Sequence, residues 1–334
     1  MEYYKNEEIG EENILIILDL NHRTMLRPED MPPTVLCLGN FDGVHRGHTA
    51  LMRAALEQAA RLRAKIPDVQ AGAWCFAVPP RRYLCDERQT QITSLCEKAD
   101  LMASLGLRYL CLGDFRDLHN MSPEDFVRDV LQELCHCVST VCGFNHRFGR
   151  GGEGTSAHLE AIFGDHALTV PPVEDSVKGG VISSSRIRAL LLDGQMAEAV
   201  RLLGHPFLLR APVMHGKALG RTIGLPTINQ NFPAGHLIPA HGIYATRVRI
   251  DGQSYIGVTN VGRRPSVQDG DHINCETHIL DFNGSLYGKV ITVEFYQKLR
   301  DEKRFDGLQA LMEAIRADAL SARHYFEQTG GGKA

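Results

Sequence analysis

The chain has 334 residues, of which 43% are hydrophobic and 23% charged, and its formal net charge is -4. Domains commonly contain roughly 100–200 residues, so this length predicts two domains, each large enough to bury a core. The small negative charge gives no reason to expect a nucleic acid or an anionic membrane as partner, because an anionic substrate needs only local basic residues.

Cysteine usage points to a reducing compartment. The nine cysteines include no C-x-x-C pair. Their odd number and the absence of a signal peptide favour free thiols and a cytoplasmic location. The longest apolar run near the start, residues 14–18, is too short to span a bilayer.

The first half alternates between strand-like and helix-like segments. Residues 1–12 are polar and acidic and are expected to fray. Strands are predicted over residues 14–20, 35–38, 72–78, 108–112 and 138–142, and helices over residues 49–64 and 93–105. A further helix opens at Ser122, with Pro123 in its first position. This alternation predicts an α/β domain with a parallel sheet covered by helices.

Three loops of the first half carry the polar and glycine residues of a ligand site. TVLCLGNFDGVHRGH (residues 34–48) has the order strand, glycine loop and helix N-terminus, which commonly holds a phosphate. GFNHRFGRGGEGT (residues 143–155) follows a later strand, and ISSSRIR (residues 182–188) opens a helix. Ligands bind beyond the carboxyl ends of parallel strands, so we expect these loops to form one site. Each alone also fits an ordinary turn or helix cap.

The strings GNFDGVHRGH, GFNHRFG and ISSSRIR together resemble the FMN adenylyltransferase module of bacterial bifunctional FAD synthetases. The two histidines of GVHRGH resemble the H-x-G-H signature of Rossmann-like nucleotidyltransferases. The resemblance implies transfer of AMP from ATP to FMN with release of pyrophosphate, and catalytic roles for His45 and His48. It implies that nucleotide or flavin is bound by Gly39, Asn40, Phe41, Asp42, Gly47, Asn145, Arg147, Phe148, Ser184, Ser185 and Arg188.

Two stretches depart from the pattern of that module. Its usual Phe-x-Pro-His-Pro strand end reads Phe-Ala-Val-Pro-Pro at residues 76–80, so Pro79 stands at the histidine position. Its usual Asp-Phe pair is replaced by Asn145 and His146. Proline has neither a donor nor a charge, and asparagine keeps only hydrogen bonding.

The second half changes character after Gly204 and Pro206, a normal helix stop. Short alternating runs with intervening turns cover residues 207–213, 243–250, 254–258, 276–282 and 290–295. They predict a small antiparallel β-barrel, followed by one helix over residues 305–326. The predicted organisation is an adenylyltransferase domain at 13–188, a linker of two short helices at 189–205, a kinase domain at 206–328 and a disordered tail at 329–334.

Oxygen-bearing side chains mark a second site in this half. Thr227 and Asn229 lie two apart in an extended segment, so their side chains point to the same side and suit Mg²⁺. Glu276 lies in a strand, where a lone glutamate is ordinarily solvated.

The strings HGKALGRTIGLPTIN, NVGRRPS, ETHILDF, LYGK and KLRDEKRF resemble a riboflavin kinase. The resemblance implies transfer of the γ-phosphoryl group of ATP to the terminal ribityl hydroxyl of riboflavin. It implies that Glu276 is the general base and that Thr227 and Asn229 bind Mg²⁺ and a nucleotide phosphate. It also implies cofactor-binding roles for Gly216, Lys217, Gly220, Arg221, Arg264 and Arg300.

Three interpretations follow. In the first, the chain makes FMN from riboflavin and ATP and then converts FMN to FAD, with small molecules as its partners and no nucleic acid or membrane. In the second, only the kinase is active, because of Pro79, Asn145 and His146. In the third, the first domain adenylates another phosphate ester and the barrel is an unrelated binding module. A nucleic-acid-binding barrel is disfavoured because the aromatic and basic platform of such sites is missing. A monomer is expected.

Overall fold

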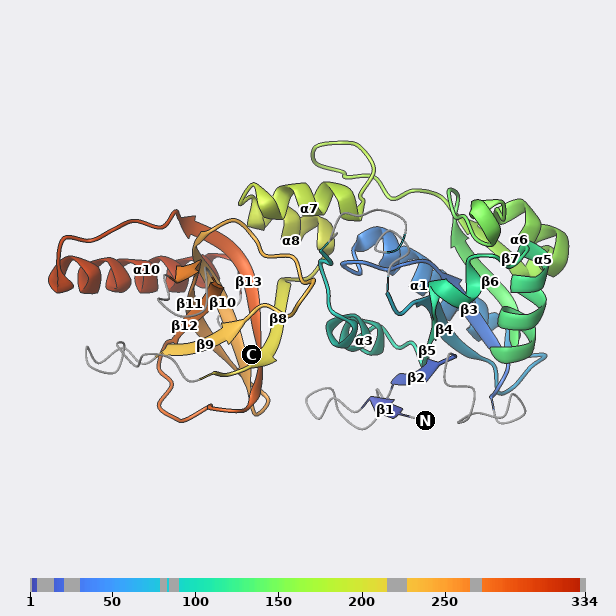
Figure 1. Cartoon of the computed structure of the whole chain (residues 1–334), viewed down its shortest axis with the longest axis horizontal. Coiled ribbons are helices and arrows are strands. Elements are labelled where there is room, and N and C mark those ends of the chain that lie inside the picture. The colour runs from blue at the N-terminus through green and yellow to red at the C-terminus, as the bar shows by residue number, and fades with distance from the viewer. Residues whose placement is uncertain are drawn as a thin grey trace. The chain divides into compact units, whose positions relative to one another are not determined.

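The computed structural model describes residues 2–4, 15–20, 31–78, 83, 90–214, 227–264 and 272–330. The chain divides into two compact units, which are described one at a time (Figure 1). The first comprises residues 1–89 and 95–183, and the second comprises residues 90–94 and 184–334. The predicted roles of Pro79, Gly216, Lys217, Gly220 and Arg221, and the predicted disorder of residues 331–334, fall outside the described residues.

A seven-stranded sheet in the order β1-β2-β5-β4-β3-β6-β7 forms the centre of the first unit. Its strands are β1 (Glu2–Tyr4), β2 (Leu15–Asp19), β3 (Thr34–Leu38), β4 (Gln70–Phe76), β5 (Tyr109–Gly113), β6 (Cys137–Gly143) and β7 (Ala167–Val170). All neighbouring pairs are parallel except β1 with β2. The predicted parallel sheet is therefore confirmed, with one correction. Residues 2–4, expected to fray, extend the free edge of β2 as an antiparallel strand.

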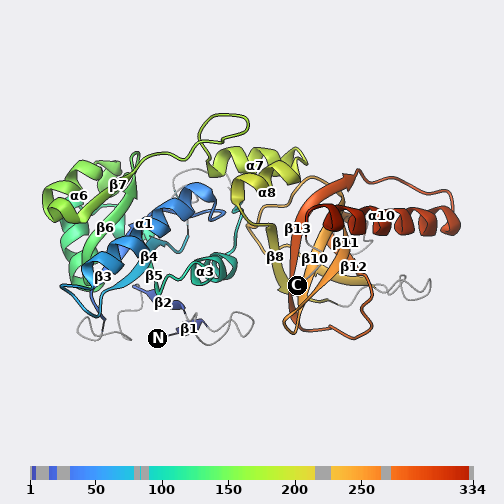
Figure 2. The same cartoon turned by 180° about the vertical axis from the view of Figure 1, so that it is seen from behind.

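Helices cover both faces of this sheet, which explains why its central strands are apolar throughout. The helical segments are α1 (Arg46–Leu62), α3 (Leu95–Ser104), α4 (Phe115–Leu118), α5 (Pro123–Asp125), η2 (Phe126–Leu134), η3 (Arg150–Gly152), α6 (Ser156–Phe163) and η4 (Gly164–His166). Val35 of β3 packs in one cluster with Met52 of α1. Its neighbour Leu36 packs in a second cluster with Phe126 of η2. Figure 2 shows α1 lying along β3 and β4.

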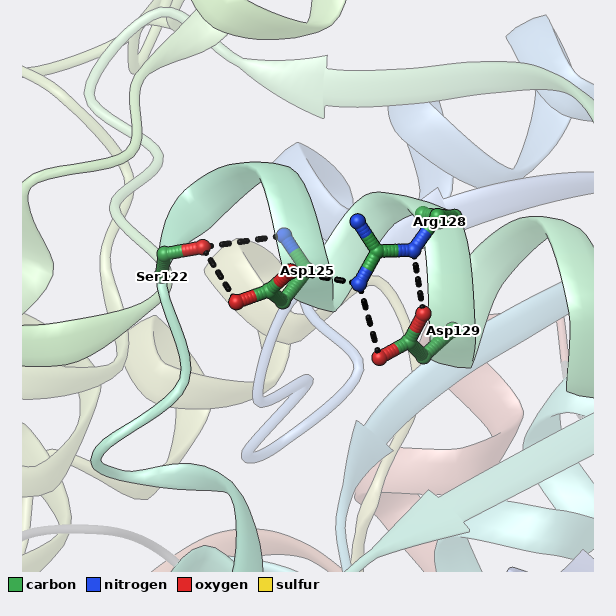
Figure 3. Close-up of polar contacts among 4 residues, drawn as sticks. All are labelled: Ser122, Asp125, Arg128 and Asp129. Atoms are coloured by element: carbon green, nitrogen blue, oxygen red, sulfur yellow. Dashed lines mark hydrogen bonds and ion pairs between the residues drawn. The ribbon is translucent and has the colours of Figure 1, made fainter.

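The predicted helix start at Ser122 is confirmed (Figure 3). Its hydroxyl accepts a hydrogen bond from the Asp125 backbone N–H (3.0 Å) and donates one to Asp125 Oδ2 (2.8 Å), while Pro123 occupies the first turn. Arg128 bridges Asp125 and Asp129 at 2.5 and 2.6 Å. Beyond the cap the helix widens into the π-helical η2, which sequence reasoning did not predict. That widened segment carries Phe126 into the wall of the cavity described below.

The second unit is a strongly curved antiparallel sheet in the order β8-β13-β10-β11-β12-β9. Its elements are α7 (Ser184–Leu192), α8 (Met196–Leu203), β8 (Phe207–Pro212), β9 (Thr227–Asn231), β10 (Gly242–Ile250), β11 (Gln253–Arg264), β12 (His272–Ile279), β13 (Val290–Arg300) and α10 (Leu308–Gln328). The Gln230 amide of β9 donates to the carbonyls of Ala211 (2.7 Å) and Ile291 (2.8 Å), which joins the two ends of the sheet. The predicted small barrel with a terminal helix is confirmed as a half-barrel.

The two short helices predicted over residues 189–204 correspond to α7 and α8. α8 ends at Gly204, whose φ of 84° is the left-handed conformation of a helix C-cap. α7 begins at Ser184, within the segment 182–188 that was predicted to open a helix, and both helices belong to the second compact unit. The functional domain boundaries stay a prediction.

α10 packs on the outer face of β10 and β11 through Ala322 and Phe326. Its Asp318 forms a bidentate ion pair with Arg300 of β13, with N–O distances of 2.9 and 2.7 Å. Of the helices in the described parts of the chain, none combines the length and apolar character that a membrane crossing requires.

Candidate active sites

The loop between β3 and α1 has a strained backbone, and its apolar side chains are buried. Phe41 and Val44 have positive φ angles of 51° and 40°, and Gly43 has 84°. A positive φ is a genuine outlier for a β-branched residue such as Val44, and such strain collects at ligand-binding loops. Phe41 and Val44 are almost completely buried, so core packing maintains the strain.

His45 and His48 form a stacked pair at the start of α1. His45 is the N-cap residue, and its Nδ1 accepts a hydrogen bond from the backbone N–H of His48 (3.3 Å). The two rings stack with centroids 3.6 Å apart, and the Phe41 ring meets His48 edge-on at 5.3 Å. A Cβ on Gly47 would lie 3.1 Å from the His45 ring, so glycine allows this close approach. The predicted pair is thus held together at a helix N-terminus.

His48 is held neutral at neutral pH. Burial, with smaller contributions from His45 and the Lys98 charge, lowers its pKa well below 6.5. The residue is partly exposed, but its Nδ1 is buried and has no hydrogen-bond partner within the described ranges. An unsatisfied imidazole nitrogen at a helix N-terminus is suited to receive a ligand group.

Lys98 is a functional candidate that sequence reasoning missed. It lies on α3, is only 4% exposed, and its Nζ donates to the Asn40 carbonyl oxygen at 2.8 Å. A lysine is almost never this buried unless its charge is paired. The ammonium therefore binds the backbone of the loop between β3 and α1, and it adds positive charge near His48.

The loops after β3 and β6 meet around one cavity of about 640 Å³, within the size range of small-molecule sites. The first loop contributes Gly39 and Asn40, and the second contributes Asn145, Arg147 and Phe148. β3 is followed along the chain by strands on one side of it, whereas β6 and β7 lie on its other side. The cavity therefore lies at the topological switch point of the sheet, beyond the carboxyl ends of β3 and β6.

Four aromatic side chains also line that cavity: Trp74, Phe76, Phe115 and Phe126. Trp74 is 3% exposed, and its indole N–H is buried without an acceptor in the described part of the chain. Sequence reasoning missed Trp74 because a tryptophan in a strand is ordinarily a core residue. The cavity wall thus combines flat apolar surfaces with polar side chains, which suits a planar ring.

His146, one of the two departures from the family pattern, also lines this cavity and stacks beside Phe148 at 5.8 Å. Burial lowers the pKa of His146 to about 4. Below pH ~6.5 the unfolded chain binds a proton at this position that the folded chain does not, so stability falls as the pH drops from about 6.5 to about 4.

Replacement His146→Phe is expected to protect the first unit against acid, because it keeps a ring beside Phe148 and removes the titration. Between about pH 7 and about pH 5 the natural protein should lose about 2 kcal/mol of unfolding free energy more than the variant. Urea unfolding followed by the fluorescence of Trp74, the only tryptophan, measures this loss in the first unit. Equal losses in the two proteins would contradict the assignment.

Three predicted ligand residues of the first site lie on a different unit. Ser184, Ser185 and Arg188 belong to α7, which is part of the second compact unit. Their approach to the phosphates stays a prediction. Asp42 lies in the loop between β3 and α1, as expected.

Thr227, Asn229 and Glu276 come together on neighbouring strands of the second unit. Asn229 of β9 lies opposite Glu276 of β12. The Thr227 hydroxyl donates to Glu276 Oε1 at 2.7 Å, and the Asn274 amide donates to Asn229 Oδ1 at 2.8 Å. Glu276 alternates along β12 with the fully buried Cys275 and Thr277, so it projects from the outer, half-exposed face. This is a compact cluster of oxygen atoms around one carboxylate.

The two predicted arginines of this half are placed differently. Arg300 is bound to Asp318 by two hydrogen bonds, and its guanidinium lies 5.8 Å from the Phe305 ring centroid. In this arrangement it fastens α10 to the sheet, and its role toward a cofactor stays a prediction. Arg264 ends β11 in register with His272, and its side chain lies outside the described atoms.

A parallel sheet with a strained phosphate-type loop at its switch point is typical of nucleotide-binding α/β units. Sequence comparison refines this class for both halves of the chain. A family model described as FAD synthetase matches residues 27–186, and one described as riboflavin kinase matches residues 203–326. The chain belongs to the bifunctional riboflavin kinase/FMN adenylyltransferase family, with the FAD synthetase domain first. The resemblance seen in the motifs is therefore confirmed.

Curated relatives named bifunctional riboflavin kinase/FMN adenylyltransferase match nearly the whole chain. The protein from Pseudomonas fluorescens is 36% identical, covering 89% of this chain and 94% of its own. The Escherichia coli K12 protein is 36% identical over 88% and 93%, and the Listeria monocytogenes protein 33% identical over 87% and 92%.

The fold also matches a solved structure. A crystal structure from Streptococcus pneumoniae, described as a macrolide-efflux protein, has a TM-score of 0.78 and 30% identity. It covers 92% of this chain and 99% of its own. This likeness shows the fold.

Proposed function

We propose that the second unit transfers the γ-phosphoryl group of ATP to riboflavin and that the first unit transfers AMP from ATP to the resulting FMN. The observation that carries the proposal is that each unit gathers its own cluster of polar side chains, one around Glu276 and one around His45 and His48. The substrates are ATP, riboflavin and FMN, and the products are FAD, ADP and pyrophosphate.

In the kinase site, Glu276 accepts the proton of the terminal ribityl hydroxyl as that oxygen attacks the γ-phosphorus. The Thr227 hydroxyl donates to one carboxylate oxygen of Glu276 and so orients the base. ADP leaves as the bond to its β-phosphate oxygen breaks. Positioning and charge neutralisation supply most of the acceleration in phosphoryl transfer.

Thr227 and Asn229 are proposed to hold Mg²⁺. Both residues lie on β9, and their side-chain oxygens lie beside Glu276 of the adjacent strand β12. Hard oxygen donors of this kind suit the ion. A magnesium site completed by substrate phosphates and water needs few protein ligands. When bound, the ion neutralises phosphate charge.

In the adenylyltransferase site, a phosphate oxygen of FMN attacks the α-phosphorus of ATP, and pyrophosphate leaves without a covalent enzyme intermediate. His45 and His48 contact the ATP phosphates at the N-terminus of α1, where the helix dipole also favours negative charge. The aromatic cavity beside Gly39 and Asn40 receives a planar ring of the substrates.

Incubation of the purified protein with riboflavin, ATP and Mg²⁺, followed by chromatography of the flavins, tests both steps. FMN should appear first and FAD second. Failure to form FMN would refute the kinase assignment, and FMN without FAD would refute the adenylyltransferase assignment.

The kinase-only reading is the second candidate. The observation that favours it is the Asn145-His146 pair in the cavity wall, which departs from the Asp-Phe pair of the resembled adenylyltransferase pattern. Asn145 is exposed to the cavity, so it retains hydrogen bonding toward a ligand, and the ring of His146 keeps the stacking position beside Phe148. Asn145 thus keeps a hydrogen-bonding group and His146 keeps a ring at these positions. The bifunctional assignment is therefore favoured over the kinase-only assignment.

A further inference from the structure

Asn260 lies beside the proposed base of the kinase site. It stands on β11 directly opposite Glu276, and Asn229 stands opposite Glu276 on the other side. Directly opposite residues of an antiparallel pair project to the same face, with Cβ atoms about 5 Å apart. Glu276 is therefore flanked by two carboxamides, Asn229 toward the sheet edge and Asn260 toward its centre.

The two carboxamides differ in their partners. Asn229 receives a hydrogen bond from Asn274, and Glu276 receives one from Thr227. Asn260 is part-buried, and its Oδ1 is shielded from solvent without a donor in the portion of the chain that the structure describes. Unsatisfied buried polar atoms are rare in native proteins, and each calls for an explanation such as a missing ligand.

The side chains around Asn260 indicate which kind of ligand it can bind. Gly262 lies two residues further on the same face, and a Cβ there would collide with the carboxylate of Glu302. On the other flank, Ile243 of β10 stands opposite Asn260 and belongs to the apolar cluster under α10. Asn260 therefore lies at the border between polar and apolar surface.

We propose that Asn260 binds the ribityl chain of riboflavin through the hydroxyl groups next to the one that is phosphorylated. A carboxamide both donates and accepts hydrogen bonds, which matches a chain of hydroxyls. Its position beside Glu276 aligns the terminal hydroxyl with the base. This inference rests on the proposed kinase function.

Steady-state kinetics of Asn260→Ala tests this contact. The KM for riboflavin is expected to rise about tenfold, the usual effect of losing one or two hydrogen bonds to neutral groups. Lumiflavin has the same ring system without the ribityl chain, and its inhibition constant against riboflavin should change by less than about twofold. Conversion of supplied FMN to FAD should be unchanged. Ser254→Ala, on the same strand and face but exposed, serves as the matched control.

Two results would overturn the proposal: an unchanged KM for riboflavin, or an equal rise in the inhibition constant of lumiflavin, since the latter reports on the ring. If Asn260→Ala does not fold, Asn260→Ser replaces it, because its hydroxyl keeps one donor and a smaller rise in KM is then expected. Absence of FMN formation by the natural protein would instead refute the kinase function itself.

Discussion

Glu276→Gln is expected to abolish phosphorylation of riboflavin while leaving conversion of supplied FMN to FAD intact. Glutamine keeps the size of the side chain and a hydrogen bond from Thr227, but it cannot accept the substrate proton. Loss of a general base typically costs about 10²–10⁴-fold in rate. The rates of FMN formation from riboflavin and of FAD formation from FMN, measured separately on the same preparation, check this result.

The matched control is Glu327→Gln, an exposed glutamate at the end of α10. It removes the same charge from the same unit and should leave both rates unchanged. If Glu276→Gln phosphorylates riboflavin within about threefold of the natural rate, Glu276 is not the base, because base catalysis contributes far more than that.

Local sequence signals predicted most elements of the fold because those elements depend on local chemistry. Ser122 and Pro123 start a helix in any context that leaves their backbone free, and the apolar runs of β3 and β5 suit only a sheet buried on both faces. The sequence did not predict β1 and β7, because they are short edge strands. Their existence depends on the unpaired edges of β2 and β6, which lie far away in sequence.

The candidate sites divide in the same way. The meeting of the loops after β3 and β6 follows from topology alone, since carboxyl ends of neighbouring parallel strands lie at one edge. Lys98 escaped because charged residues of an amphipathic helix are expected to face solvent, and only packing of α3 under the loop reveals its burial. Arg300 was predicted to bind a cofactor, but the structure pairs it with Asp318. Local sequence could not predict this ion pair, because it forms only when α10 packs on the sheet.

The two proposed sites belong to different compact units, so variants of one site can be compared with variants of the other. Each unit has its own hydrophobic core and its own polar cluster, so removal of a reacting group in one should not disturb the other. A substitution that impairs both reactions equally would contradict this independence.

His48→Ala is expected to lower the rate of FAD formation from FMN by about 10²–10³-fold, the usual effect of removing one preorganised transition-state contact. The variant deletes the neutral imidazole whose Nδ1 has no hydrogen-bond partner among the described residues, and with it the ring stacked on His45. Formation of FMN from riboflavin should be unchanged. Flavin chromatography with FMN as the starting substrate isolates the first reaction, and riboflavin isolates the second.

His166→Ala provides the control, because His166 is an exposed histidine of the same unit. Normal FAD formation by His48→Ala would refute the assignment of the H-x-G-H loop. A parallel loss of FMN formation would argue against two independent centres. Because burial holds His48 neutral, its contribution in the free enzyme is that of a hydrogen-bonding imidazole rather than a fixed cation. The positive charge at the loop then comes from Lys98 and the N-terminus of α1, so FAD formation should survive in His48→Gln better than in His48→Ala.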